Sequence, residues 1–494
     1  MTRRGARALR LIAGLLVCLA PACTATRGPR ATAGSIPAAA TAPDAAVAGR
    51  VEARFAAAES EALWSVRIER ADTRAVVVDR QSDRLVIPAS NMKIVTLAAA
   101  ATRLGWDYRF QTTIGSRGGR EAHVLRGDLL VVGGADPTIG SGTDPLATFR
   151  EWAQTLRASG LRRIDGDLIG DPSRFGVDWL GDTWSWGDLP FGYGAAYSGL
   201  TYHENMARLT VTPADSPDSE ALVSLDPEGT GLVVSARVVT SASVPTAALQ
   251  VRRDPGSAVL SVEGTVPIGG AALTRTVAVP DPAMFFLTAF RTALAEAGVE
   301  VRGRTRVEPT ADPGDTVLLT HWSEPLAQVA HRFMKVSQNL YGEALLRVLA
   351  PERATSMADA RRITASTLET LGVTAGQVQG IDGSGLSRRD FLTSRALVTL
   401  LQAMAQPPHR EVFRATLPVA GVDGTLASRF KDGPCAGRLA AKTGTLSNVR
   451  ALSGYLTSAT GTPYVFSVIA NNYLGAAARI DEVVDEALNA LCAS

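Results

Sequence analysis

Residues 88–105 have the sequence PASNMKIVTLAAAATRLG, which predicts a helix that is apolar on nearly every face. Pro88 and Ser90 stand where such a helix begins, and Gly105 stands where it ends. A helix that is apolar all round is buried in the centre of a domain. Lys93 therefore lies in a buried segment, where a cationic side chain needs a partner or a chemical task.

Ser90 and Lys93 form an S-x-x-K pair at the start of this helix. Positions i and i+3 share one helix face, so the Lys93 amine can lie beside the Ser90 hydroxyl. A serine hydroxyl is a weak nucleophile that needs an adjacent base. Lysine can serve as that base when burial and a second positive charge lower its pKa, whereas arginine keeps its proton.

Lysine is scarce in this chain, which makes each lysine informative. Among 50 basic side chains the only lysines are Lys93, Lys335, Lys431 and Lys442. Ser337-Gln338-Asn339 is an S-x-N motif at the start of a second predicted helix, and Lys442-Thr443-Gly444 is a K-T-G motif on a predicted strand. Two of the four lysines thus stand in the S-x-x-K and K-T-G motifs of penicillin-binding proteins and serine β-lactamases, in the order those proteins show.

Each motif alone has an ordinary structural explanation. Ser90 could be a helix cap, Lys93 a solvated helix residue, and Lys442 a charge that protects an edge strand. The three motifs together favour the catalytic interpretation.

The sequence resembles the D-alanyl-D-alanine carboxypeptidase/endopeptidase family of low-molecular-mass penicillin-binding proteins, class C type, which carry a large insertion between S-x-x-K and S-x-N. The interval from Lys93 to Ser337 is far longer than in a simple β-lactamase. Four further stretches carry the resemblance, namely GGADP (133–137), GDLIGD (166–171), DGSGLSR (382–388) and GTL (424–426). The resemblance covers nearly all of the chain after residue 50.

The resemblance implies an α/β multidomain fold, with a serine β-lactamase/transpeptidase-like domain and an inserted, largely β two-domain block. The expected bounds are 49–112 and 290–494 for the discontinuous catalytic domain, 113–205 and 262–289 for inserted domain II, and 206–261 for a small β domain III. Short β-type runs between 113 and 290 agree with this division. Helices are predicted at 147–159, 281–298, 324–349 and 479–491, and strands at 438–455 and 463–471.

The motif residues have expected roles in an acyl-enzyme mechanism on Ser90. Lys93 is the base, and the backbone N–H groups of Ser90 and Thr445 form the oxyanion hole. Lys442, expected at a partly exposed position, binds the substrate carboxylate with Thr443 beside Gly444. Ser337 relays a proton to the leaving amine, and Asn339 holds the amide of the acyl side chain.

A second group of residues concerns specificity. Trp184, Trp186 and Asp188 form W-x-W-x-D, followed by Tyr193 in a loop-like stretch. The resemblance implies that Asp188 and Arg388 hold the zwitterionic end of the diamino acid side chain of the substrate, for which an Asp–Arg pair is the electrostatic complement. The alternative is that the tryptophans form a small satellite core under a loop.

The N-terminus predicts a signal peptide at residues 1–22, because four arginines precede an apolar run from Leu11 to Ala22 that is too short to span a bilayer. Residues 23–48 form a flexible linker. The expected location is the periplasm or the outer cell surface, and lipidation of Cys23 stays open. In an oxidising compartment Cys435 and Cys492 form either one disulfide or two unpaired thiols.

Other classes of function are disfavoured. No C-x-x-C, H-E-x-x-H or histidine cluster predicts a metal or another cofactor, and the net charge of +2 does not indicate nucleic-acid binding. The expected partners are peptidoglycan stem peptides, with β-lactam antibiotics as covalent inhibitors, and the oligomeric state is undetermined. A β-lactamase and a catalytically silent peptidoglycan-binding protein remain as alternatives, whereas the absence of G-x-S-x-G argues against a Ser-His-Asp hydrolase.

Overall fold

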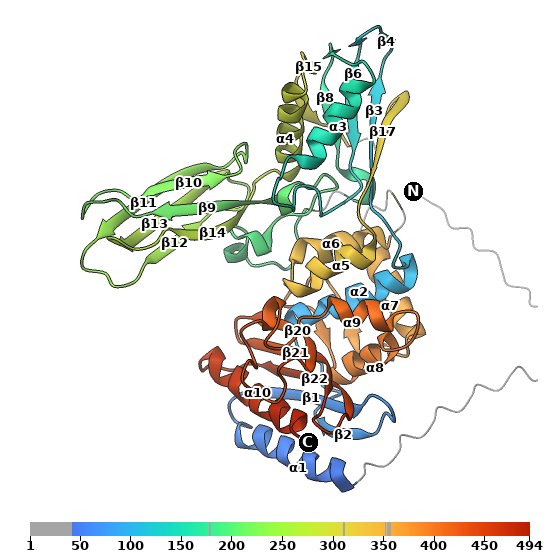
Figure 1. Ribbon diagram of the computed structural model, residues 1–494, viewed down its shortest axis with the longest axis vertical. Coiled ribbons are helices and arrows are strands. Elements are labelled where there is room, and N and C mark those ends of the chain that lie inside the picture. The colour runs from blue at the N-terminus through green and yellow to red at the C-terminus, as the bar shows by residue number, and fades with distance from the viewer. Residues whose placement is uncertain (1–41, 177–178, 310–311, 351, 353–356) are drawn as a thin grey trace, which may run out of the picture. The chain divides into compact units, whose positions relative to one another are not determined.

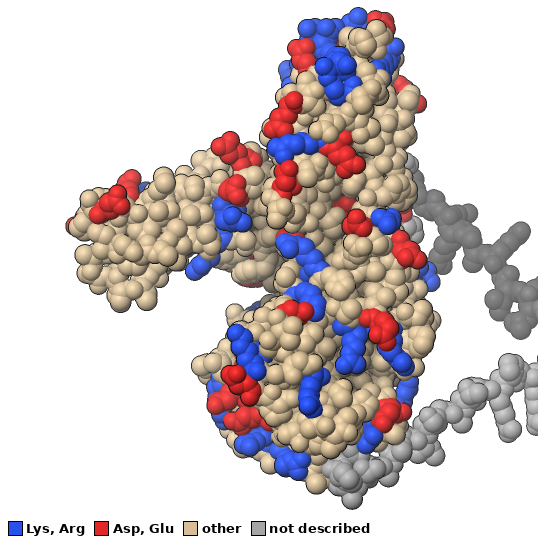
Figure 2. All heavy atoms as spheres, viewed as in Figure 1, with Lys and Arg blue, Asp and Glu red and all other residues tan. Residues whose placement is uncertain are grey.

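The computed structural model describes residues 42–494 except 177–178, 310–311, 351 and 353–356 (Figure 1). The predicted signal peptide, Cys23 and residues 23–41 of the predicted linker lie outside the described residues. Residues 42–48, expected as the end of the flexible linker, instead begin a helix, α1 (Ala42–Ala57), in which Val47 is buried in the core, so the prediction was wrong for this part of the linker. Within the described part, no helix is both long enough and apolar enough to span a bilayer. Acidic and basic side chains both occur over the face drawn in Figure 2, in keeping with the small net charge.

A five-stranded antiparallel sheet joins the two ends of the described chain. Its strand order is β2 (Val76–Arg80), β1 (Leu63–Arg70), β22 (Pro463–Asn471), β21 (Val449–Thr457) and β20 (Leu439–Leu446). Helices α1 (Ala42–Ala57) and α10 (Ala477–Cys492) pack together on one face of this sheet, through residues such as Phe55 and Leu488 (Figure 1). Because helices cover both faces, β22 is buried along almost its whole length.

The other face of the sheet is covered by a group of helices around α2. After a short 3₁₀ helix, η1 (Ala89–Asn91), α2 (Met92–Leu104) has buried side chains at ten successive positions from Met92 to Ala101, which confirms the predicted buried helix. Its neighbours are α5 (Leu326–Lys335), α6 (Asn339–Val348), α7 (Met357–Thr370) and α8 (Ser394–Met404), and α9 (Arg410–Thr416) packs on α5. The two-stranded β18 (Val378–Gln379) and β19 (Phe391–Leu392) complete this part.

The structure divides the helical pattern expected at 324–349 into α5 and α6. The break falls at Ser337, whose φ of 62° lies in the left-handed region. A single residue in this conformation ends one helix and redirects the chain into the next. The S-x-N motif therefore occupies a tight corner between two helices.

A second five-stranded sheet lies in the inserted part, in the order β16 (Thr305–Val307), β8 (Leu168–Asp171), β6 (Asp128–Val132), β3 (Gln111–Arg117) and β17 (Thr316–Trp322). Helices α3 (Ala147–Ala158) and α4 (Pro282–Glu296) pack on each other through aromatic side chains, among them Trp152 and Phe286. A smaller sheet contains β15 (Glu300–Val301), β7 (Arg163–Ile164), β5 (Val124–Leu125) and β4 (Arg120–Glu121).

Two smaller sheets form a separate β sandwich, whose core includes Leu209 and Leu260. One has the order β10 (Leu222–Asp226), β9 (Met206–Thr212), β14 (Leu273–Ala278), and the other has the order β11 (Val233–Ser241), β13 (Val259–Pro267), β12 (Ala248–Arg252). Short 3₁₀ helices η2 (Ser173–Phe175), η3 (Trp186–Asp188), η4 (Gly192–Gly194) and η5 (His203–Asn205) precede the sandwich, and η6 (Gly424–Leu426) precedes β20.

The strand pairing differs from two boundaries expected from the sequence. Residues 300–322, expected in the catalytic part, contain β15, β16 and β17, which pair with β7, β8 and β3 of the insertion. Residues 262–278, expected in domain II, contain the rest of β13 and all of β14, which pair with strands of the β sandwich. Both differences arise because strand partners are chosen by pairing across the sheet rather than by position along the chain.

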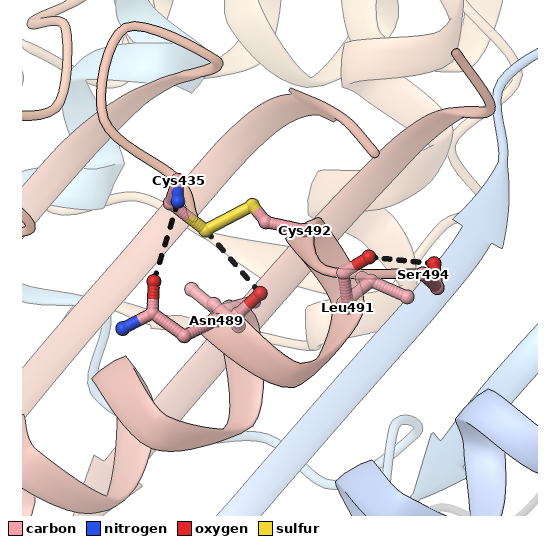
Figure 3. The surroundings of a disulfide bond; sticks show 6 residues. Cys435, Asn489, Leu491, Cys492 and Ser494 are labelled. Carbon is pink, nitrogen blue, oxygen red and sulfur yellow. Dashed lines mark hydrogen bonds between the residues drawn. A yellow bond between two sulfur atoms is a disulfide. The ribbon is translucent and has the colours of Figure 1, made fainter. Parts of the chain in front are cut away.

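A disulfide joins Cys435, which precedes β20, to Cys492 at the end of α10 (Figure 3). Both cysteines are fully buried, and the Cys435 N–H donates to the side chain of Asn489. The structure thus decides between the two alternatives that the sequence left open. The disulfide ties the last helix to the segment that leads into the K-T-G strand.

Candidate active site

A cleft of about 440 Å³ contains most of the residues that the motifs singled out. Its walls come from η1, the corner between α5 and α6, the DGSGL turn at 382–386, the edge strand β20 and the inserted segment 183–193. The predicted site residues that line it are Ser90, Ser337, Asn339, Thr443, Thr445, Asp188 and Arg388. Segments that are hundreds of residues apart in the sequence thus meet at one place.

The Lys93 amine lies at the centre of the polar contacts. Its Nζ donates to Ser90 Oγ at 2.9 Å, to Asn339 Oδ1 at 2.7 Å and to the Ser384 carbonyl at 2.7 Å. These three acceptors occupy all three donor positions of an ammonium group. The S-x-x-K and S-x-N motifs are therefore joined directly by one side chain.

Burial changes the acidity of Lys93. The side chain is fully buried, and the loss of solvation lowers its pKa from the usual 10.5 to about 7. The carboxylates of Asp382, Glu343 and Asp390 oppose this shift by favouring the charged form. A lysine with a pKa near neutrality can exchange a proton with the serine hydroxyl that it touches.

Lys442 of the K-T-G motif contacts Ser337. Its Nζ donates to Ser337 Oγ at 2.8 Å and to the Thr443 carbonyl at 2.8 Å. The side chain is fully buried and is not part of the cleft wall, so the expectation of a partly exposed position was wrong. Burial, together with the positive charge of Lys93, holds the pKa of Lys442 well below its usual value.

The strand β20 presents its free edge to the cleft. Near its start, the Ala441 N–H donates outward to the Pro418 carbonyl, and the Leu439 carbonyl accepts from Ala420 N–H. Because these directions alternate along a strand, the N–H of Thr445 also points outward, on the side of the cleft. The hydroxyl of Thr443 lies 2.7 Å from that of Thr425, and both line the cleft.

Gly444 allows β20 to approach the turn that carries Ser90. A Cβ at this position would lie 2.7 Å from the Pro88 carbonyl and 3.0 Å from the side chain of Asn91. A contact of 2.7 Å to a backbone oxygen essentially never occurs for a real Cβ, so the strand or the turn would have to move. The glycine of the K-T-G motif is therefore required by packing rather than by chemistry.

The DGSGL turn is a functional element whose role the motifs did not reveal. The carboxylate of Asp382 accepts hydrogen bonds from three backbone N–H groups of this turn, Ser384, Gly385 and Ser387. Glu343 on α6 accepts from the N–H groups of Gly383 and Ser384 at 3.1 Å each. These bonds hold the Ser384 carbonyl in the position where it accepts from Lys93.

Burial also affects Glu343 itself. The loss of solvation, followed by the nearby charge of Asp382, raises its pKa to about 7. Arg347, one turn further along α6, lies 3.3 Å from the other carboxylate oxygen. Sequence spacing alone could have found the Glu343–Arg347 pair, but the target of Glu343 lies on a different segment.

Asp188 and Arg388, which were predicted to set specificity, both line the cleft, and each contacts its own surroundings. Asp188 Oδ1 accepts from the Tyr193 hydroxyl at 3.1 Å, and Arg388 Nη2 donates to the Ser447 carbonyl at 3.0 Å. Trp184 is buried against Leu189 and Leu386, while Trp186 is 77% exposed. The satellite-core alternative is thus correct for Trp184, and its indole N–H donates to Asp382.

Among the described residues, no group of three or more His, Cys, Asp or Glu side chains has the arrangement of a metal site. A serine beside a buried lysine, an S-x-N corner and a K-T-G edge strand define an acyl-serine hydrolase of the class that includes penicillin-binding proteins and β-lactamases.

The chain belongs to the D-Ala-D-Ala carboxypeptidase 3 (S13) family, whose model matches residues 47–490. It is 35% identical to a D-alanyl-D-alanine carboxypeptidase of Actinomadura sp. (strain R39), over 83% of this chain and 79% of that protein. It is 25% identical to the D-alanyl-D-alanine carboxypeptidase DacB of Haemophilus influenzae, over 81% of this chain and 83% of that protein. The expected enzyme class, a serine-type D-Ala-D-Ala carboxypeptidase, is thereby confirmed.

A solved structure shows the same fold. Penicillin binding protein 4 of Haemophilus influenzae superposes with a TM-score of 0.79, at 23% identity, over 90% of this chain and 99% of that chain. A complex of the same protein with a β-lactam superposes with a TM-score of 0.71, at 22% identity, over 89% and 98%. The expected α/β fold of the transpeptidase type is therefore confirmed.

Proposed function

We propose that Ser90 is the nucleophile of a carboxypeptidase reaction on peptides that end in D-Ala-D-Ala, the stem peptides of peptidoglycan. The single observation that carries this proposal is the 2.9 Å contact between Lys93 Nζ and Ser90 Oγ, at a lysine whose pKa is lowered to about 7. Neutral Lys93 takes the Ser90 proton as Oγ attacks the carbonyl carbon of the penultimate residue. Intact catalytic contacts argue against a silent binding protein.

The tetrahedral intermediate needs donors for its negative oxygen. The backbone N–H groups of Ser90 and Thr445 serve as this pair in the proposed mechanism. The outward direction of the Thr445 N–H, at the open edge of β20, supports its part. The terminal carboxylate of the substrate is bound by the cleft-lining hydroxyls of β20, Thr443 and Thr445, next to Thr425.

Lys442 acts from behind the cleft wall. Because it is buried and donates to Ser337 Oγ, its role in the mechanism is to orient Ser337 and to supply a proton through it. Ser337 then passes a proton to the nitrogen of the departing D-Ala. Asn339, held between Lys93 and the Tyr193 carbonyl, binds the amide of the acyl group. Water finally hydrolyses the ester on Ser90.

Asp188 and Arg388 form the proposed site for the free end of a diamino acid side chain. One carboxylate and one guanidinium on the cleft wall match the ammonium and carboxylate groups of that end. Their separate contacts, with Tyr193 and with the Ser447 carbonyl, support two fixed positions rather than a pair that neutralises itself.

A labelling experiment tests the nucleophile. Incubation with labelled penicillin, followed by proteolysis and mass spectrometry, should give one adduct on the peptide that contains Ser90. Ser90→Ala should abolish the adduct, while Ser366→Ala, at an exposed serine on α7, should retain it. An adduct that persists in Ser90→Ala would refute the assignment.

A second experiment with the wild-type protein tests which bond is cleaved. Mass spectrometry of products from purified peptidoglycan peptides distinguishes the loss of a terminal D-Ala from the cutting of cross-links, which would be D,D-endopeptidase activity. The signal-peptide pattern at 1–22 supports export to the periplasm or outer surface as part of this proposal. Edman sequencing of the secreted protein would test the cleavage site and Cys23.

A further inference from the structure

A buried carboxylate of the insertion contacts the S-x-N corner. Glu204, in the 3₁₀ helix η5, is 3% exposed and lies against α5 and the start of α6. Its two oxygens accept from Arg332 on α5, through Nε and, at 2.9 Å, through Nη2. The same Oε2 accepts from Gln338 Nε2 at 2.8 Å. Gln338 is the middle residue of the S-x-N motif.

The backbone that presents Glu204 is held in an unusual conformation. Three successive residues, His203, Glu204 and Asn205, have φ values of 48°, 55° and 56°, in the left-handed region that non-glycine residues avoid. The Asn205 side chain fixes this turn by donating to the Ala196 carbonyl and accepting from the Tyr202 N–H. Such a conformation persists only where surrounding contacts determine it.

Gln338 transmits the position of Glu204 to the corner. Its amide nitrogen donates to Glu204, and its amide oxygen accepts from the Leu340 N–H at 3.3 Å, in the first turn of α6. Its neighbours on either side, Ser337 and Asn339, contact Lys442 and Lys93 respectively. The Gln338 side chain thus links Glu204 of the insertion to the backbone between Ser337 and Asn339, which both line the cleft.

We propose that Glu204 is a positioning residue for the acylation reaction, which it supports by holding Gln338 and so the Ser337–Asn339 corner. This inference rests on the proposed function of Ser337 and Asn339. Ser337 itself has a left-handed φ of 62°, so the corner depends on contacts outside its own backbone. Glu204 supplies such a contact by accepting from Gln338, and hydrogen bonds to a carboxylate are stronger than those between neutral groups.

Glu204→Gln tests the proposal with almost no change of shape. An amide offers one acceptor oxygen in place of two, so in either orientation its NH₂ group faces an N–H of Arg332, and in one orientation it also faces the side-chain amide of Gln338. We expect the acylation rate constant at saturating penicillin to fall about tenfold or more, because small misplacements of catalytic groups have effects of this size. The apparent dissociation constant of the non-covalent complex should change less than threefold.

Two further variants separate positioning from stability. Gln338→Met removes the same contact from the other side, and the double variant should be no more than twofold slower than Gln338→Met alone. Asp171→Asn is the matched control, since Asp171 is a buried carboxylate of the insertion that accepts from Ser173 of its own segment. Asparagine keeps the oxygen that accepts both hydrogen bonds from Ser173, so this variant should fold and leave the acylation rate unchanged.

Several results would overturn the proposal. These are acylation within twofold of wild type in both single variants, losses that add in the double variant, or an equal slowing in Asp171→Asn. If Glu204→Gln does not fold, Gln338→Met decides the question by the same criterion. Wild-type protein that penicillin does not acylate would refute the proposed function, whereas normal wild-type acylation with unaffected variants refutes this inference alone.

Discussion

Replacing Lys93 by arginine should nearly abolish acylation while the positive charge is retained. Arginine cannot lose its proton at any working pH, so Ser90 would have no base. A positioned general base contributes roughly 10²–10⁴-fold to the rate, and the loss should lie in that range. Lys431→Arg, at an exposed lysine away from the cleft, is the matched control and should acylate as the wild type does.

The pH dependence of the wild type gives the same reasoning a second test. Because burial lowers the pKa of Lys93 to about 7, the neutral amine increases as pH rises through this value. From the ordinary titration of one group, about a tenth of Lys93 is neutral at pH 6 and about nine-tenths at pH 8. The acylation rate constant should therefore rise almost tenfold between these values and then level off.

Stopped-flow measurement of acylation by a chromogenic β-lactam gives the rate constant of Lys93→Arg. The same measurement from pH 5.5 to 9 gives the pH profile of the wild type. Circular dichroism at each pH shows whether the protein stays folded. A flat profile through pH 7 in the folded wild type would show that Lys93 is not the titrating base. Acylation by Lys93→Arg at a tenth of the wild-type rate or more would refute the mechanism outright.

Three further predictions concern the walls of the cleft and the support of β20. Asp188→Asn or Arg388→Gln should lower kcat/KM about tenfold or more for a peptide with a zwitterionic diamino acid end, but barely for diacetyl-lysyl-D-Ala-D-Ala; equal losses would indicate a structural role. The double replacement Cys435→Ser/Cys492→Ser should lower the free energy of unfolding by about 4 kcal/mol, because the disulfide no longer closes a loop of 57 residues. Urea titration measures this difference, and an unchanged unfolding transition would contradict the prediction. Gly444→Ala should slow acylation at least tenfold, since its Cβ would meet the Pro88 carbonyl at 2.7 Å, and normal acylation would show that the strand can move freely.

Features that depend on short stretches of chain could be predicted from the sequence. The burial of α2 was visible because its apolar residues cover every face of one helix, and the pairing of Ser90 with Lys93 follows from their separation by three positions. The helices α3 and α4 and the strands β20 to β22 could also be predicted, because the apolar pattern of each lies within its own segment. Lys93 and Lys442 could be recognised as members of one site because the chain contains only four lysines, and two of them stand in the S-x-x-K and K-T-G motifs.

The boundaries of the insertion could not be predicted in this way. The strand β17 belongs to the sheet of β3, about 200 residues earlier, and nothing within residues 316–322 indicates this partner. Strand pairing depends on a match between two segments, so it is a property of both together. The same limit applies to the disulfide, because a sequence shows two cysteines but not the distance between them.

The class of chemistry could be identified from short motifs, namely a serine with its lysine, an S-x-N motif and a K-T-G motif. The surroundings of these groups are visible in the folded protein alone. The depth of Lys442, the turn that holds the Ser384 carbonyl against Lys93, and the contact of Glu204 with Gln338 all join segments that are distant in the chain. The physical reason is that a pKa or the position of a backbone corner depends on what surrounds it in space, and local sequence contains no record of those neighbours.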